Sequence, residues 1–346
     1  MQNALVDFDP KALAEHLELK PFQGRQIFQW LHQKGVFDFD SMTNISKAMR
    51  ADLKSRARPS HLELVHLAES KKSPGTRKAV WRLQDGETVE SVLIREGERR
   101  TICISSQVGC AVKCSFCATG ISGFQRNLSP GEIAEQATRM TVSDAMEGRT
   151  PNIVYMGMGE PFRNFDNVVA SIQLLTHRDG LGIGARKITV STAGEAPGIY
   201  AFAEMPWQVR LSLSLHAAND VKRSELVPLN KKYPIAKLLA AVDYYLEHAG
   251  RQITLEWALL RGVNDTKQDA NELADIALPR RAFVNVIPYN PVAGLPYSAP
   301  DRNSAAAFRD HLLHRGVQVT LRKEQGQDID AACGQLRRRV EEFASS

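Results

Sequence analysis

The sequence is poor in cysteine and has no long hydrophobic segment. It contains 5 cysteines among 346 residues. This odd number, crowded mostly into positions 103–117, is not the pattern of a secreted disulfide framework. No apolar run approaches the roughly 20 residues that a membrane helix requires. Residues 1–20 carry acidic side chains where a signal peptide carries basic ones. We therefore expect a cytoplasmic protein that binds no membrane.

Positive charge is not in large excess over the whole chain, but it is unevenly distributed. The 44 basic and 39 acidic residues give a net charge of +5, and the hydrophobic fraction is 43%, which excludes a largely disordered chain. Residues 20–58 hold eight Lys or Arg and three Asp. This local excess favours a phosphate-facing surface, although a solvated helix face gives the same pattern.

Hydrophobic patterns divide the chain into three segments. Residues 1–58 have helix-compatible spacing, and residues 59–100 resemble a short β-meander with strands near 62–68, 77–83 and 88–94. From residue 101, helix candidates that include 131–140, 167–175, 235–250 and 305–316 alternate with strand candidates at 101–106, 152–159, 187–193, 209–216, 252–260, 284–290 and 317–323. Repeated β/α units predict an α/β fold with parallel strands, as an open or closed barrel.

Polar residues follow the ends of several predicted strands. Function gathers at the C-terminal ends of the strands in such barrels, and one or two polar loops there would be unremarkable. Here a cysteine-rich loop follows the first strand, and the later strand ends carry Gly159, Glu160, Ser191, Ser214, Leu215, His216 and Asn290. So many such residues at the C-terminal ends of neighbouring strands predict a binding site there.

Three cysteines form the most specific short motif. Cys110, Cys114 and Cys117 have the spacing C-x3-C-x2-C, and thiolates this close in sequence converge on a metal or cluster unless they are simply buried. A structural zinc needs four ligands, and Cys103 could be the fourth. However, Cys103 lies between two isoleucines of a predicted strand, so alternation turns it into the barrel. Three ligands favour a [4Fe–4S] cluster with one open iron, and zinc is the alternative.

Longer motifs around these residues resemble a known family. They are SSQVGCAVKCSFCATG, GFQRNL, YMGMGEP, SLSLHA, NKKYPI, GVNDT and DIDAACGQL. Together they resemble the radical S-adenosylmethionine (SAM) enzymes, and more specifically the RlmN/Cfr family of RNA adenine methyltransferases, closer to RlmN. The resemblance covers nearly the whole chain. It implies a partial (β/α)6 TIM-like radical SAM barrel with a C-terminal extension over residues 101–346, after an RNA-binding helical domain at 1–58 and a meander at 59–100.

The resemblance also implies roles for individual residues. The three motif cysteines would hold the cluster, and the seven strand-end residues named above match SAM-contacting positions. Cys333 matches the methyl-carrying cysteine, and Cys103 matches the cysteine that resolves a protein–RNA adduct through a transient disulfide with Cys333. Glu90 falls where the family places a proton acceptor. Without the resemblance, both cysteines would be ordinary packing residues and Glu90 a solvent-facing strand residue.

The implied activity is methylation of an adenine ring carbon in 23S rRNA, with tRNA as a further substrate. The motifs favour carbon C2, and C8 of the same adenosine or another RNA target are alternatives. The implied cofactors are the cluster and two SAM molecules per turnover, with a low-potential electron donor such as flavodoxin or ferredoxin, and we expect a monomer. Two other classes stay open at this point: a zinc-stabilised, non-catalytic RNA-binding protein and a radical enzyme for small molecules.

Overall fold

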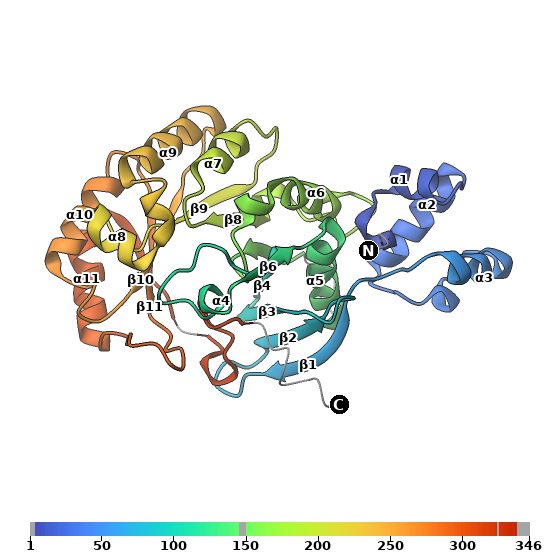
Figure 1. Cartoon of the computed structure of the whole chain (residues 1–346), viewed down its shortest axis with the longest axis horizontal. Helices are drawn as coiled ribbons and strands as arrows, with labels where there is room; N and C mark the ends of the chain where they lie inside the picture. The colour runs from blue at the N-terminus through green and yellow to red at the C-terminus, as the bar shows by residue number, and fades with distance from the viewer. Residues whose placement is uncertain (1–3, 145–149, 324, 338–346) are drawn as a thin grey trace.

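The N-terminal part of the protein is a group of short helices. The computed structural model describes residues 4–144, 150–323 and 325–337. The first elements are η1 (Leu5–Asp7), α1 (Pro10–His16), α2 (Pro21–Phe28), η2 (Gln29–Gln33), η3 (Phe39–Ser41) and α3 (Lys47–Arg56). Asp9 and Ser46 cap the N-termini of α1 and α3 through their side chains. Figure 1 shows α1, α2 and α3 together at one end of the molecule.

A single ten-stranded sheet forms the frame of the described residues, in the order β1-β2-β3-β4-β7-β8-β9-β10-β11-β12. Its strands are β1 (Glu63–Glu69), β2 (Arg77–Arg82), β3 (Thr88–Glu96), β4 (Arg99–Cys103), β7 (Asn152–Tyr155), β8 (Ile188–Thr192), β9 (Arg210–Ser214), β10 (Thr254–Leu259), β11 (Phe283–Pro288) and β12 (Gln318–Leu321). Strands β1 to β4 pair antiparallel, and β4 to β12 pair parallel. The meander therefore continues directly into the barrel sheet.

Helices connect the parallel strands on the outside of the sheet (Figure 1). The main crossovers contain α5 (Pro130–Ser143), α6 (Phe165–Thr176), α7 (Ala196–Ala203), α9 (Ile235–Ala249), α10 (Lys267–Ala277) and α11 (Arg302–His314), and α8 (Asp220–Leu226) precedes α9. In the part of the chain that the structure describes, β1 and β12 are the sheet edges, so the predicted barrel is open. No helix in this part combines the length and apolar composition needed to cross a membrane.

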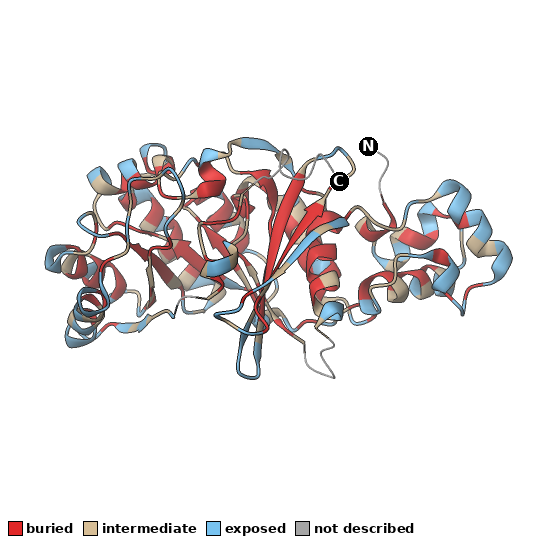
Figure 2. Cartoon of the chain, turned by 90° about the horizontal axis from the view of Figure 1, so that it is seen from below, coloured by how far each residue is buried: buried red, intermediate tan, exposed pale blue. Residues whose placement is uncertain are grey.

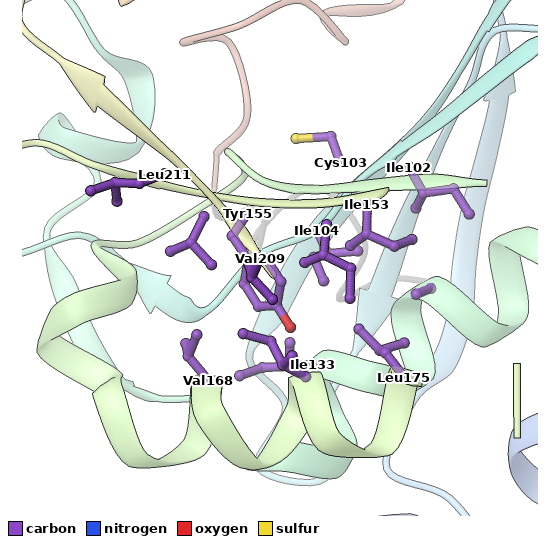
Figure 3. Packing of buried hydrophobic residues seen from close by; sticks show 14 of the residues in the cluster. Ile102, Cys103, Ile104, Ile133, Ile153, Tyr155, Val168, Leu175, Val209 and Leu211 are labelled. Carbon is purple, nitrogen blue, oxygen red and sulfur yellow. The ribbon is translucent and has the colours of Figure 1, made fainter. Parts of the chain in front are cut away.

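The core lies between the sheet and these helices, where Figure 2 shows buried residues along the strands and the inner helix faces. Ile102 and Ile104 pack there with Ile133 of α5 and Val168 of α6. Figure 3 shows the Cys103 side chain pointing away from the side on which Ile104 and Ile133 pack. The predicted alternation at β4 is therefore confirmed.

A buried ion pair joins the N-terminal helices to the rest of the molecule. Asp7 Oδ2 lies 2.6 Å from His61 Nε2, and Asp7 Oδ1 accepts hydrogen bonds from Ser129 Oγ at 2.6 Å and Gly131 N at 2.9 Å. Ser129 and Gly131 stand at the N-terminus of α5, where a carboxylate is favourable. One carboxylate thus links η1, the segment before β1 and a barrel helix.

Candidate active site

A cavity opens at the C-terminal ends of the parallel strands, where ligand sites of such folds lie. It brings together most of the residues predicted from the sequence: Cys110, Cys114, Cys117, Gly159, Glu160, Ser191, Ser214, His216, Asn290 and Cys333. Leu215, Cys103 and Glu90 do not line this cavity. The residues that the strand-end rule singled out therefore line, for the most part, one cavity.

The cysteine loop is held in shape by its glycines and by long-range hydrogen bonds. It begins after β5 (Gln107–Gly109), which pairs with β6 (Phe124–Asn127), and ends in α4 (Ala118–Ile121). Gly109 has φ +74°, and a Cβ there would lie 1.7 Å from the backbone oxygen of Gly123, so only glycine fits. Ser115 N donates to Leu226 O at 3.0 Å. These contacts turn the three motif thiols toward the cavity.

The motif cysteines fit cluster ligation in number and chemistry. All five cysteines of the chain are free thiols, and the three motif cysteines line the cavity while Cys103 does not, so the proposed fourth zinc ligand is not beside them. Burial raises the pKa of Cys110 to about 12 and raises the pKa of Cys114 well above its ordinary value. A metal or cluster that binds them must displace their protons. Among the described residues, no group of three or more His, Cys, Asp or Glu could hold a metal ion as the side chains stand.

Glu160 is fixed at the end of β7 by three hydrogen bonds. Its carboxylate accepts from Phe162 N at 3.1 Å, Thr192 Oγ1 at 2.8 Å and Ala193 N at 2.7 Å. Burial raises its pKa to about 6, and these hydrogen bonds oppose the shift. A carboxylate has about four acceptor positions, so Glu160 can still accept one donor from a ligand in the cavity. Gly159, with φ +110°, packs against Gln107 where a Cβ would collide.

The ends of β8 and β9 contribute hydroxyl and imidazole groups. Ser191 Oγ and Ser214 Oγ lie 3.2 Å apart on neighbouring strands. His216 has φ +59°, and its Nδ1 accepts from Ala258 N at 3.0 Å, which leaves Nε2 as the proton-bearing nitrogen. Burial, and then the charge of Arg223, lower the pKa of His216 to about 3. His216 is therefore a neutral donor toward the cavity, not a titrating base.

Arg223 is a buried cation that supports the cavity wall through the backbone of Ala193, and the sequence did not reveal it. It is fully buried below the rim, and it donates to Leu215 O at 3.1 Å and Ala193 O at 2.6 Å. Burial lowers its pKa to about 10, so it remains charged. Leu215 is fully buried and does not line the cavity, and its backbone oxygen accepts from Arg223. Nothing in the local sequence of α8 distinguishes Arg223 from a surface arginine.

Glu256 is a second residue that the sequence analysis passed over. It lies on β10 and lines the cavity, with bonds from Asn285 Nδ2 at 2.7 Å and Ser212 Oγ at 3.2 Å. Burial raises its pKa, against the effect of the nearby Arg322 and these bonds. A glutamate inside the apolar strand QITLEWALL was the available signal, since buried acids in strands are rare.

A smaller cavity adjoins the first and contains the other predicted cysteine pair. Cys103, Arg322 and Cys333 line it, and Asn290 and Cys333 line both cavities. Burial, with the neighbouring Cys333 adding to it, raises the pKa of Cys103 to about 12. The transient disulfide expected from the resemblance is not formed here, and both sulfurs are thiols beside one cavity.

The loop that carries Cys333 is anchored by contacts from distant elements. Gly334 O accepts from Ala118 N of the cysteine loop at 2.8 Å. Asp328 accepts from Ser70 Oγ at 2.6 Å, in the turn between β1 and β2. Asn290, a predicted SAM contact, donates to Cys333 O at 3.5 Å and accepts from Gln327 Nε2 at 2.9 Å, so its amide is engaged by this loop.

Glu90 lies apart from both cavities. The residue is fully buried, so the solvent-facing alternative is wrong. Its carboxylate accepts from Arg337 N at 3.0 Å and lies 3.4 Å from Lys78 Nζ. Because Arg337 follows the Cys333 loop, Glu90 holds the far end of that loop in this structure.

Two known families match this chain, one at the N-terminal helices and one in the barrel. Residues 3–58 match the ribosomal RNA large subunit methyltransferase N-terminal domain, and residues 104–274 match the radical SAM superfamily. A crystal structure of a radical SAM methyltransferase from Sphaerobacter thermophilus superposes with a TM-score of 0.94 at 42% sequence identity, covering 98% of this chain and all of that one.

Curated relatives extend the match over nearly the full length. A protein of Thermotoga maritima named "Probable dual-specificity RNA methyltransferase RlmN" is 46% identical over 323 residues, which cover 93% of each chain. A protein of Protochlamydia amoebophila with the corresponding name, RlmN 2, is 44% identical over 335 residues, covering 96% of this chain and 93% of the relative. These matches are to RNA methyltransferases. They therefore argue against the two alternatives raised from the sequence, a non-catalytic zinc-stabilised protein and a radical enzyme for small molecules. The chain belongs to the RlmN family of radical SAM RNA methyltransferases.

Proposed function

We propose that the chain methylates carbon C2 of an adenine in 23S rRNA, and an adenine in tRNA, through a methyl group carried on Cys333. The observation that carries this proposal is the position of Cys333 on both cavities, one shared with the motif cysteines and the other with Cys103. A sulfur in that position can accept a group in the larger cavity and remain beside Cys103. The words "dual-specificity" in the relatives' names support two kinds of RNA substrate.

In this proposal, Cys110, Cys114 and Cys117 hold a [4Fe–4S] cluster, and the cavity beside them binds SAM. When bound and reduced, these groups supply the radical chemistry that an electrophilic adenine carbon requires. Glu160 offers its remaining acceptor position to the SAM ammonium, and Ser191, Ser214 and His216 offer donors to its polar groups. Two SAM molecules serve each turnover, and the electron comes from a low-potential carrier such as flavodoxin or ferredoxin.

The two remaining cysteines have different roles: Cys333 carries the methyl carbon, and Cys103 releases the product. Cys333 would accept the methyl group on its sulfur, and the methyl carbon would bond to the adenine ring after giving one hydrogen atom to the radical that the cofactors supply. The adduct would then lose one electron, and its ring proton would go to Glu90. The Cys103 thiolate would next attack the Cys333 sulfur, so that the sulfur–carbon bond breaks, its electron pair and a proton go to the carbon, and the disulfide releases the methylated RNA. Both thiols line the smaller cavity, which supports this exchange.

Glu90 would act as the proton acceptor only after a change in the C-terminal segment. Its carboxylate is bonded to Arg337 N, so that bond must open before the carboxylate can reach an adenine held at Cys333. A Glu90→Gln variant keeps the shape and removes the base. Under this proposal it accumulates the covalent protein–RNA adduct, whereas a purely structural role predicts no adduct.

The decisive experiment is mass spectrometry of ribosomal and transfer RNA from a strain that lacks this gene and from the same strain complemented with it. The proposal predicts that a methyl group on C2 of a 23S rRNA adenosine and of a tRNA adenosine disappears and returns. A methyl group on C8 would support the alternative regiochemistry. RNA that is identical in both strains would overturn the proposal.

A further inference from the structure

The guanidinium of Arg322 lies beside the sulfur that the proposed function uses. Arg322 Nη1 donates to Cys333 Sγ at 3.9 Å, and Arg322, Cys103 and Cys333 line the same small cavity. The arginine directly follows β12, and its backbone N donates to Val286 O of β11 at 2.8 Å. The last pair of parallel strands therefore fixes the place from which this side chain reaches the sulfur.

Electrostatics make the two cysteines of this cavity unequal. The sulfur of Cys333 is the largest influence on Arg322 and raises its pKa; burial opposes this, while Glu256 and Cys103 add to it. For Cys103 burial dominates, and the pKa of its thiol is about 12 even though Arg322 lowers it. Cys103 is thus protonated at neutral pH, while Cys333 has the direct hydrogen bond to a cation.

Other charged or titratable groups surround the Cys333 sulfur. Cys103 and Lys323 share the smaller cavity with Cys333, and the larger cavity adds Glu160, His216, Glu256, Cys110, Cys114 and Cys117. Glu96 and Glu256 act on Arg322, and Asp330 lies on the Cys333 loop, where its backbone oxygen accepts from Lys78 Nζ. The acids among them oppose a thiolate, and burial keeps His216 neutral. The hydrogen bond from Arg322 is the contact that favours a negative sulfur.

We propose that Arg322 is a positioning residue that directs the methyl group to Cys333 rather than to Cys103, because its guanidinium donates a hydrogen bond to the Cys333 sulfur and stabilises the negative charge on that sulfur once the thiol proton has left. This inference rests on the proposed function. The thiol proton leaves to solvent, and the thiolate gives an electron pair to the methyl carbon of the SAM sulfonium. The bond from that carbon to the sulfonium sulfur breaks, and its electron pair stays on the departing thioether. No oxidation or reduction occurs in this step.

The test measures the reactivity of Cys333 without RNA and without turnover. Full-length chains with an unmethylated Cys333, verified by intact mass, are treated with iodoacetamide over a range of pH, and peptide mass spectrometry follows the label on Cys333. Only the thiolate reacts, so the rate traces the thiolate fraction. In Arg322→Gln the curve moves to higher pH. For each unit of movement the neutral-pH rate falls about threefold, since tenfold less thiolate is offset by about threefold greater intrinsic nucleophilicity.

Two further variants keep the result interpretable. Arg322→Lys retains the charge, so its curve stays near the wild type, and a curve displaced as in Arg322→Gln overturns the role of charge. Lys323→Gln removes a neighbouring cation without a hydrogen bond to the sulfur and leaves the curve in place. An unmoved curve in Arg322→Gln, or a lower plateau at high pH from blocked access, also overturns the inference.

These outcomes are independent of the proposed function. Normal adenine methylation with an unmoved Arg322→Gln curve refutes the role of Arg322 alone. A displaced curve in a chain that leaves RNA unchanged in the strain experiment refutes the RNA proposal alone.

Discussion

The pair of Asp7 and His61 provides a test of how the helical part is held against the barrel. Their side chains are only 8% and 7% exposed, so solvent screens the pair little. Substituting Asp7→Asn keeps the size of the side chain and removes its charge. It also weakens the bonds from Ser129 and Gly131, which then meet a neutral amide oxygen instead of a carboxylate.

The pKa shifts set the sign of the pH dependence. Burial alone raises the pKa of Asp7, but the hydrogen bond and charge of His61, with Ser129 and Gly131, lower it overall. Burial alone lowers the pKa of His61, but Asp7, Glu132 and Glu135 raise it overall. The pair therefore stabilises the folded protein most between the ordinary values of about 4 for Asp and about 6.5 for His. This contribution is lost as pH rises through the raised pKa of His61.

The size of the effect follows from burial. Removing one partner of a buried ion pair costs about 3–5 kcal/mol, and the amide of asparagine retains part of the hydrogen bonding. We expect Asp7→Asn to lower the free energy of the first unfolding transition in urea by about 3 kcal/mol near pH 5.5, and by clearly less once the pH has risen through the raised pKa of His61. Circular dichroism in urea at one pH value below that pKa and one above it measures this difference.

A matched control uses the second ion pair between the same parts. Arg25 Nη2 lies 2.6 Å from Asp179 Oδ1, and Arg25 is 54% exposed. Asp179→Asn should cost no more than about 1 kcal/mol, equally at both pH values, because this pair contains no histidine. If Asp7→Asn has the same cost at both pH values, or if Asp179→Asn shows the larger pH dependence, our reasoning about the Asp7 carboxylate is refuted.

Three further predictions concern the site. Cys333→Ala should abolish RNA methylation with the iron content unchanged, whereas Cys103→Ala should leave protein covalently attached to RNA, visible as a slower band on a denaturing gel; normal turnover of Cys103→Ala would exclude the two-thiol route. Gly109→Ala places a Cβ 1.7 Å from a backbone oxygen, so it should cost most of the bound iron and sulfide after anaerobic preparation. Lys47→Gln, on exposed α3, should weaken RNA binding and reduce its salt slope by about one if it contacts one phosphate, whereas Lys237→Gln on α9 should change neither.

The parallel strands were predictable from the sequence because buried strands contain runs of consecutive apolar residues. The predicted segment 252–260 contains β10 (Thr254–Leu259), and 284–290 overlaps β11, as expected for strands covered on both faces. Helix α7 was not among the helix candidates. It is eight residues long, contains Pro197 and Gly198, and buries much of its length, so it lacks the polar face that marks a surface helix.

The site was predictable where its chemistry is local and unpredictable where it depends on distant contacts. The C-x3-C-x2-C spacing and the polar strand ends are visible in short segments. Arg223 and Arg322 have no such signal, because only folding brings them near the atoms that they contact, which are Ala193 O, Leu215 O and the Cys333 sulfur. The burial of Glu90 was unpredictable for the same reason, because its carboxylate accepts a hydrogen bond from Arg337 N, 247 residues away.

The Cys333 loop shows why the resemblance to the family spans the whole chain. Apart from the short turn η7 (Gln327–Ile329), the loop has no regular structure to hold it, so its position depends on its anchors. One anchor comes from the turn between β1 and β2, one from the cysteine loop, and one from Glu90 on β3. The meander and the cysteine loop must therefore both be folded before this sulfur lies between the two cavities. A change in either of them moves the sulfur relative to the other.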